Sequence, residues 1–235
     1  MPATAIMGPD EPACGQAPHV PITVEADDLM GEGEERKLAA VGVTFGLCAS
    51  KTFFTGPQGS ITVWLTRGAA TWIRFDHEEY VSWLIGEVTV ADAFPTLTAS
   101  MVPNALVDAV VPGFTEDRAV VLLQVQPGSS TAPEACRTPE GVKVTVLDQP
   151  AAKVLYRAAG ASGSYEAARA VTSAEGVAVI RDLLPGATTA EIAASKPGCE
   201  YRAAYGDANS LLPIPIVRTP LFPGAITYLV LNPVW

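Results

Sequence analysis

The chain has 235 residues, of which 49% are hydrophobic and 17% are charged, and this composition argues against intrinsic disorder. Its length suffices for one large or two small domains. The formal net charge is −10, and residues 1–40 hold 8 acidic side chains against 2 Lys and Arg. Because the basic residues form no cluster, we expect neither nucleic acid nor an anionic membrane as a partner. No hydrophobic run is long enough for a membrane span.

Residues 1–40 are polar, acidic and rich in Pro and Gly, and we predict an N-terminal arm there. The start of the chain has no basic segment followed by a hydrophobic one, so we expect no signal peptide in it. A calcium loop is the alternative for the acidic part, since clustered carboxylates suit that ion. The spacing does not fit an EF-hand, so we favour a solvated arm and expect no metal. The clustered carboxylates are Glu25, Asp27, Asp28, Glu32, Glu34 and Glu35.

Short strand patterns follow, and they predict a β-rich domain over residues 41–126 of no recognised family. The clearest is Ser60–Thr66, where hydrophobic and polar side chains alternate as in a half-buried strand. One short helix is predicted between Asn104 and the Pro112-Gly113 pair. Residues 127–139, rich in Ser, Thr, Pro and Gly, are predicted to be a linker. The other expected strands are 38–48, 53–54, 70–75, 80–90 and 119–125.

Residues 140–235 contain seven further strand candidates separated by turn signals. This number and spacing are typical of a small Greek-key sandwich. We therefore predict an all-β protein with two β-sandwich-like domains, the second seven-stranded. The candidates are 142–146, 152–156, 168–172, 177–181, 187–195, 214–219 and 225–231.

The segment from Thr172 to Gly186 predicts a hairpin in this second domain. Gly176 can adopt the positive φ that a tight turn needs, and Pro185-Gly186 is typical of a second turn. Because of these turn residues and the strand between them, the part of the chain from about residue 137 to residue 235 resembles the carboxypeptidase regulatory-like, transthyretin-like β-sandwich family. The resemblance implies a sandwich that acts as a folding, spacing or docking module without chemistry of its own. We also expect Leu183 to be buried, because it shares its parity with Val177 and Val179.

Four cysteines lie two in each half of the chain, which suggests one disulfide in each domain. We expect Cys14 to pair with Cys48 and Cys136 with Cys199. The alternative is four free thiols in a cytosolic protein. We favour disulfides because a turn-rich β protein with few lysines and an even number of cysteines resembles exported proteins.

The densest polar cluster of the first half is Asp76-His77-Glu78-Glu79, which lies between Trp72 and Trp83. These six residues are the candidate binding site. They could supply an acid–base pair or metal ligands, and the tryptophans could stack against sugar rings. The alternatives are an exposed turn for the cluster and core positions for the tryptophans, and we favour both. No catalytic residue, metal site or cofactor is assigned.

We therefore predict a non-catalytic binding, adhesion or scaffold protein located outside the cell, in the periplasm or on the cell surface. Its ligand would be a protein or a carbohydrate. One alternative is a carbohydrate-directed or metal-dependent enzyme whose site lies in the first half. The other is a subunit of a surface assembly, joined through edge-strand pairing of the hydrophobic segment 211–221.

Overall fold

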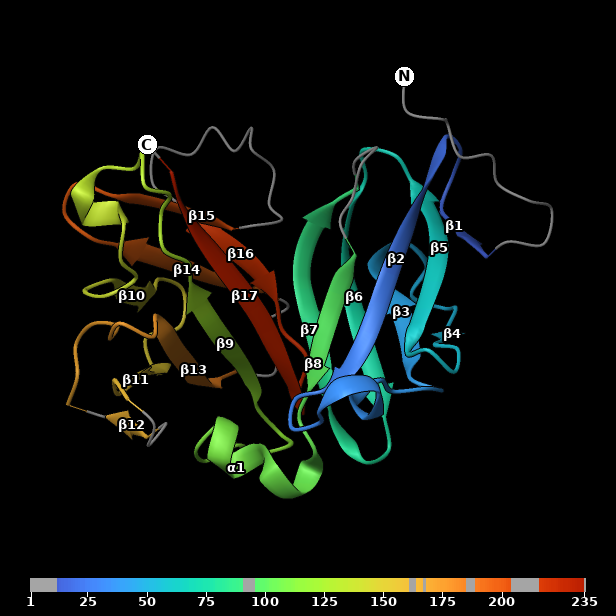
Figure 1. Ribbon diagram of the computed structural model, residues 1–235, viewed down its shortest axis with the longest axis horizontal. Helices are drawn as coiled ribbons and strands as arrows, with labels where there is room; N and C mark the ends of the chain where they lie inside the picture. The colour runs from blue at the N-terminus through green and yellow to red at the C-terminus, as the bar shows by residue number, and fades with distance from the viewer. Residues whose placement is uncertain are drawn as a thin grey trace. The chain divides into compact units, whose positions relative to one another are not determined.

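The computed structural model describes residues 12–90, 96–160, 164–166, 168–184, 189–203 and 216–234. In this part of the chain the protein is all-β, with one short α-helix, α1 (Val107–Val110), and it divides into two units (Figure 1). Unit 1 is Met1–Val107 and unit 2 is Asp108–Trp235. None of the helices found here has the length and hydrophobicity needed to cross a bilayer.

Unit 1 contains two sheets. In the first, β2 lies between β5, to which it is antiparallel, and β8, to which it is parallel, while the short β1 covers part of the other edge of β5. The second sheet is antiparallel, in the order β4-β3-β6-β7. The strands are β1 (Ala13–Cys14), β2 (His19–Asp28), β3 (Gly42–Phe45), β4 (Phe53–Phe54), β5 (Ser60–Thr66), β6 (Ala70–His77), β7 (Tyr80–Thr89) and β8 (Leu97–Met101).

Alternation along β6 shows why this sequence forms a half-buried strand. Thr71, Ile73 and Phe75 are buried, whereas the residues between them are only partly buried. A strand places successive side chains on opposite faces, so one face of β6 is in the core and the other is accessible. Three 3₁₀ turns lie in this unit: η1 (Gly33–Arg36), η2 (Gly46–Cys48) and η3 (Asn104–Leu106).

Unit 2 also contains two sheets (Figure 1). The larger has the order β12-β11-β13-β9-β17, with β15 on β17; β9 is antiparallel to β13 and parallel to β17. The smaller is antiparallel, β10-β14-β16. The elements are β9 (Ala119–Val125), η4 (Glu134–Cys136), β10 (Lys143–Val146), β11 (Lys153–Arg157), β12 (Tyr165–Glu166), β13 (Val177–Leu183), β14 (Thr189–Ser195), β15 (Glu200–Ala203), β16 (Ile216–Pro220) and β17 (Ala225–Val234).

The division of the chain differs from the predicted one in two places. Residues 19–28, assigned to an arm, form the strand β2 inside a sheet, because Ile22, Val24 and Ala26 alternate and are buried. β9, assigned to the first domain, pairs with β13 and β17 of unit 2. The boundary therefore lies between Val107 and Asp108, before the predicted linker 127–139.

The predicted disulfides are confirmed. Cys14 is bonded to Cys48 in unit 1, with 5.6 Å between their Cα atoms, and Cys136 is bonded to Cys199 in unit 2, with 5.4 Å. Each bridge joins a strand, or the end of one, to a 3₁₀ turn. The described part of the chain contains no free cysteine.

The burial of Leu183 is confirmed, but the parity argument for it is wrong. Leu183 is completely buried and belongs to the core cluster of Ala178 and Ile180, on the face opposite Val179. The register against β9 shifts between Ile180 and Leu183, and Asp182 has a φ of 62°. This bulge inserts one residue and returns Leu183 to the face of Ile180. The following Pro185-Gly186 turn lies outside the described residues.

Six of the seven strands predicted for residues 140–235 form, but 168–172 does not. Thr172 instead exchanges hydrogen bonds with Val142: its backbone N–H donates to the Val142 carbonyl, and its hydroxyl accepts from the Val142 N–H. The Tyr156 hydroxyl bonds to both backbone groups of Val144: it accepts from the N–H at 2.9 Å and donates to the carbonyl oxygen at 3.3 Å. The hydroxyl groups of Thr172 and Tyr156 therefore bond to backbone groups of Val142 and Val144 that would otherwise need a neighbouring strand as their partner.

Candidate functional site

The candidate site is one face of the sheet β4-β3-β6-β7 in unit 1. Cross-strand pairing places Phe54, Gly42 and Asp76 in one row, and Thr44 and Arg74 in the next. Paired residues of an antiparallel sheet point to the same side, and on β4, β3 and β6 this side is opposite the core. On β7 the residue paired with Arg74, Leu84, is completely buried, so the accessible part of this face does not include it. We call the exposed or partly exposed side chains of this face the outer strip: Thr44, Phe54, Trp72, Arg74, Asp76 and Ser82.

A charged pair occupies the middle of the outer strip. Arg74 Nε donates to Asp76 Oδ1 at 2.9 Å, and Ser82 Oγ donates to the same oxygen at 2.5 Å. Arg74 Nη2 lies 3.3 Å from Ser82 Oγ, so the three side chains fix one another. The hydrogen bonds that Asp76 makes with described residues all reach Oδ1. Its side chain is 42% exposed, and the capacity of Oδ2 to accept hydrogen bonds is not used by any described residue.

Two aromatic side chains of the strip lie over glycines. Phe54 is 62% exposed, and its Cε1 atom is 3.7 Å from the point where a Cβ on Gly42 would lie. The indole Nε1 of Trp72 is 2.8 Å from the corresponding point at Gly46. Because glycine has no side chain, the Phe54 ring rests on the backbone of strand β3 and the Trp72 ring on the first residue of η2, which restricts both rings.

The six residues predicted from sequence do not come together. Asp76 and Trp72 lie on the outer strip, but Trp83 pairs with Phe75 and is 3% exposed in the core, on the opposite face of the sheet. A joint platform of the two tryptophans is therefore excluded. Glu78 and Glu79 are exposed in the β6–β7 turn.

The other side chains of this turn are tied to neighbouring elements. His77 Nδ1 accepts from the Glu79 N–H at 3.3 Å, and the His77 ring packs edge-on against Tyr80. The Tyr80 hydroxyl donates to Asp28 Oδ2 at 3.0 Å. Partial burial, followed by the hydrogen bond to the Asp28 carboxylate, raises the pKa of Tyr80 to about 12. Tyr80 is thus a protonated donor that anchors the turn.

Two carboxylates of the acidic segment, Glu25 and Asp27, are paired with the cations Arg36 and Lys37. Asp27 is 3% exposed and pairs with Arg36 at 2.7 Å and with Lys37 at 3.1 Å. Lys37 also donates to Glu25 at 2.8 Å, and this hydrogen bond raises the pKa of the Lys37 ammonium. Within the described residues, no group of three or more His, Cys, Asp and Glu could hold a metal ion. These ion pairs join β2 to Arg36 at the end of η1 and to Lys37 directly after it.

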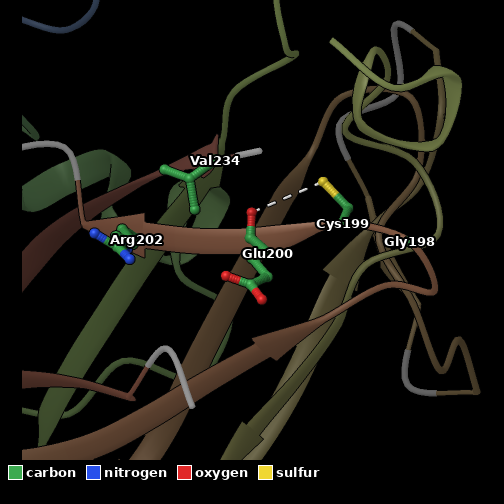
Figure 2. Close-up of a pocket in the computed structure, with 5 residues that line it drawn as sticks. All are labelled: Gly198, Cys199, Glu200, Arg202 and Val234. Carbon is green, nitrogen blue, oxygen red and sulfur yellow. Dashed lines mark hydrogen bonds between the residues drawn. The ribbon is translucent and has the colours of Figure 1, made fainter. Parts of the chain in front are cut away.

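Unit 2 has a surface depression of about 630 Å³ beside its disulfide (Figure 2). Glu200 and Arg202 alternate on β15 and line it together with Gly198, Cys199 and Val234. The dashed line in Figure 2 marks the 3.8 Å approach of Cys199 Sγ to the Glu200 carbonyl oxygen; a disulfide sulfur has no proton to donate, so this is a contact only. Both charged side chains come from one strand, so the depression offers no converging set of groups.

Sequence reasoning missed Phe54, Arg74 and Ser82. Phe53 and Phe54 were identified as a strand, but two adjacent phenylalanines do not show which one faces the core. The structure places Phe53 edge-on against Phe45 at 5.9 Å and turns Phe54 outward. The alternation of Trp72, Arg74 and Asp76 with buried residues is visible in the sequence and marks one face of a strand.

The sequence matches no protein-family model and no curated protein. Solved structures with a similar arrangement include the TIE protein of Bacillus anthracis, at 9% identity, 92% coverage of this chain, 34% of that chain and a TM-score of 0.27. A streptococcal ancillary pilin is 14% identical, with 91% of this chain and 62% of that chain covered and a TM-score of 0.27. A variant of the shaft pilin SpaA from Lactobacillus rhamnosus GG is 11% identical, with 92% of this chain and 98% of that chain covered and a TM-score of 0.26. The chain thus spans less than two thirds of the first two proteins.

Proposed function

We propose that this chain is a non-catalytic binding or scaffold protein that works outside the cytoplasm, in the periplasm, outside the cell or on its surface. The observation that carries the proposal is the disulfide in each unit, Cys14–Cys48 and Cys136–Cys199. Disulfides form and persist in oxidising compartments and are rare in the cytosol. Two separately cross-linked β-sandwich units suit a protein that must remain folded there.

The arrangement of the polar groups supports a binding role rather than catalysis. A general acid or base must itself lie within hydrogen-bond reach of the group whose proton it transfers. His77 instead bonds to the Glu79 backbone in a turn, and Asp76 is held by Arg74 and Ser82. These contacts position side chains in a fixed display.

The resemblance of residues 137–235 to carboxypeptidase regulatory-like domains gives unit 2 a spacing or docking role within this proposal. The alternative role, assembly through segment 211–221, stays a prediction, since residues 211–215 lie outside the described residues. β16, which contains part of this segment, pairs with β14.

The proposal is tested by thiol labelling of protein isolated from its native source without reductant. Under denaturing conditions, maleimide should label none of the four cysteines before reduction and all four afterwards. Free thiols in the native protein would contradict a location outside the cytoplasm.

The non-catalytic part is tested with generic ester, glycoside and peptide substrates, comparing the wild type with His77→Ala and Asp76→Asn. We expect no turnover. Turnover that either substitution lowers by about 10²-fold or more would assign an enzyme instead.

A further inference from the structure

We propose that the outer strip of unit 1 binds an extended carbohydrate, with the Phe54 ring and the Asp76 carboxylate as its central contacts. This inference rests on the proposed binding function and names the class of ligand. It is carried by the exposed aromatic ring, the adjacent fixed charged pair, and the second aromatic ring further along the same face.

Phe54 supplies a flat hydrophobic surface. Single exposed hydrophobic side chains are common and need no explanation. Phe54 differs because its ring rests over Gly42 in the same row as Asp76, two strand spacings or about 10 Å away, so a ligand longer than one sugar ring can contact both. The C–H face of a pyranose ring packs on such a surface while its hydroxyl groups reach the neighbouring side chains.

Asp76, Arg74 and Ser82 supply those polar contacts. Asp76 Oδ1 is held by the other two side chains, and Oδ2 has no hydrogen-bond partner among the described residues, on a side chain that is 42% exposed. A fixed carboxylate accepts from sugar hydroxyls, and a guanidinium donates to them, without a cost for ordering either side chain. Thr44 and Thr52, whose hydroxyl oxygens are 3.4 Å apart, add two further hydroxyls to this face.

The length of the strip selects an extended ligand. Trp72 lies on the same face of β6, four positions from Asp76, and a strand advances about 3.3 Å per residue. The distance along β6 between Trp72 and Asp76 is therefore about 13 Å, which is longer than one sugar ring. Phe54 lies on β4 in the row of Asp76, so an oligosaccharide that contacts both aromatic rings crosses the sheet diagonally from Phe54 to Trp72, past Thr44 and Arg74.

Other occupants fit this face less well. A peptide that adds a strand needs an open backbone edge, whereas these side chains stand above strands that are bonded to each other. A nucleic acid would meet a chain of net charge −10.

The test measures binding of cellohexaose, chitohexaose and mannohexaose to the full chain by titration calorimetry. We expect at least one to bind, and Phe54→Ala and Asp76→Asn each to raise its Kd about tenfold or more. Met30→Ala is the matched control, since Met30 is 61% exposed in the same unit but lies in the turn after β2, away from the strip. It should leave Kd unchanged. Circular dichroism of each variant checks folding.

Binding that Phe54→Ala and Asp76→Asn leave unchanged would overturn the site, and no binding of any of the three saccharides would overturn the ligand class. Equal losses in all three variants would also overturn the site. Each of these results leaves the proposed function intact as long as both disulfides are formed and no turnover is seen. Free thiols or turnover, by contrast, would refute the proposed function itself.

Discussion

Removing one hydroxyl group, in the substitution Tyr156→Phe, should measurably destabilise unit 2. Tyr156 is 3% exposed, and its hydroxyl accepts a 2.9 Å hydrogen bond from the Val144 N–H and donates one of 3.3 Å to the Val144 carbonyl oxygen. Val144 is itself 4% exposed, so no water replaces the lost partner. A buried N–H left unsatisfied costs about 1–3 kcal/mol, and we expect the free energy of unfolding to fall by this amount.

The assay is urea unfolding followed by far-ultraviolet circular dichroism, with the midpoint shifted and the slope unchanged. The matched control is Tyr201→Phe. Tyr201 is 1% exposed, and its hydroxyl has no hydrogen-bond partner among the described residues, so its removal should be neutral or stabilising. Hydrogen exchange at the Val144 amide should accelerate only in Tyr156→Phe. The reasoning is refuted if Tyr201→Phe costs as much as Tyr156→Phe, or if the Val144 amide stays equally protected.

Three further predictions follow from burial and charge. Leu183→Ala should lower the free energy of unfolding by about 2–5 kcal/mol, whereas Leu184→Ala, at a 49% exposed position, should change it by less than about 0.5 kcal/mol; equal urea midpoints would contradict this. Asp27→Asn should cost about 1–3 kcal/mol, because a buried partner of two cations loses its charge; unchanged unfolding by tryptophan fluorescence would show that the ion pairs add no stability. Tyr80 should ionise near pH 12 in an absorbance titration, and Asp28→Asn should lower that pKa. Because the folded pKa exceeds the unfolded value of 10.0, the stabilisation is complete below pH 10 and is lost as the pH rises toward 12.

The disulfide pairing was accessible from sequence because two cysteines lie in each half of the chain. For Leu183 the prediction was correct, but position beside a turn does not explain it, since the adjacent Leu184 is 49% exposed. The reason for the burial of Leu183 was not accessible, since the bulge at Asp182 is a register shift against β9, and register is a property of the pair.

The partners of strands and the faces of side chains were the hardest to predict. β9 was assigned to the wrong unit because a hydrophobic strand of seven residues carries no mark of its neighbours. Trp72 and Trp83 are the same residue type and both lie in hydrophobic strand patterns. Only the pairing of β6 with β7 shows that they face opposite sides of the sheet. Phe54 was missed for the same reason.

The parallel pairing of β9 with β17 sets an order for the appearance of unit 2 during synthesis or export. It joins Val120 to Ile226, so the centre of the larger sheet cannot form until residues 225–234 have emerged. Until then β9, with its hydrophobic residues Val121 and Leu123, has one strand edge unpaired. An exposed edge of this kind invites pairing with other chains. The emerging chain therefore carries this unpaired edge for as long as the late strand is missing.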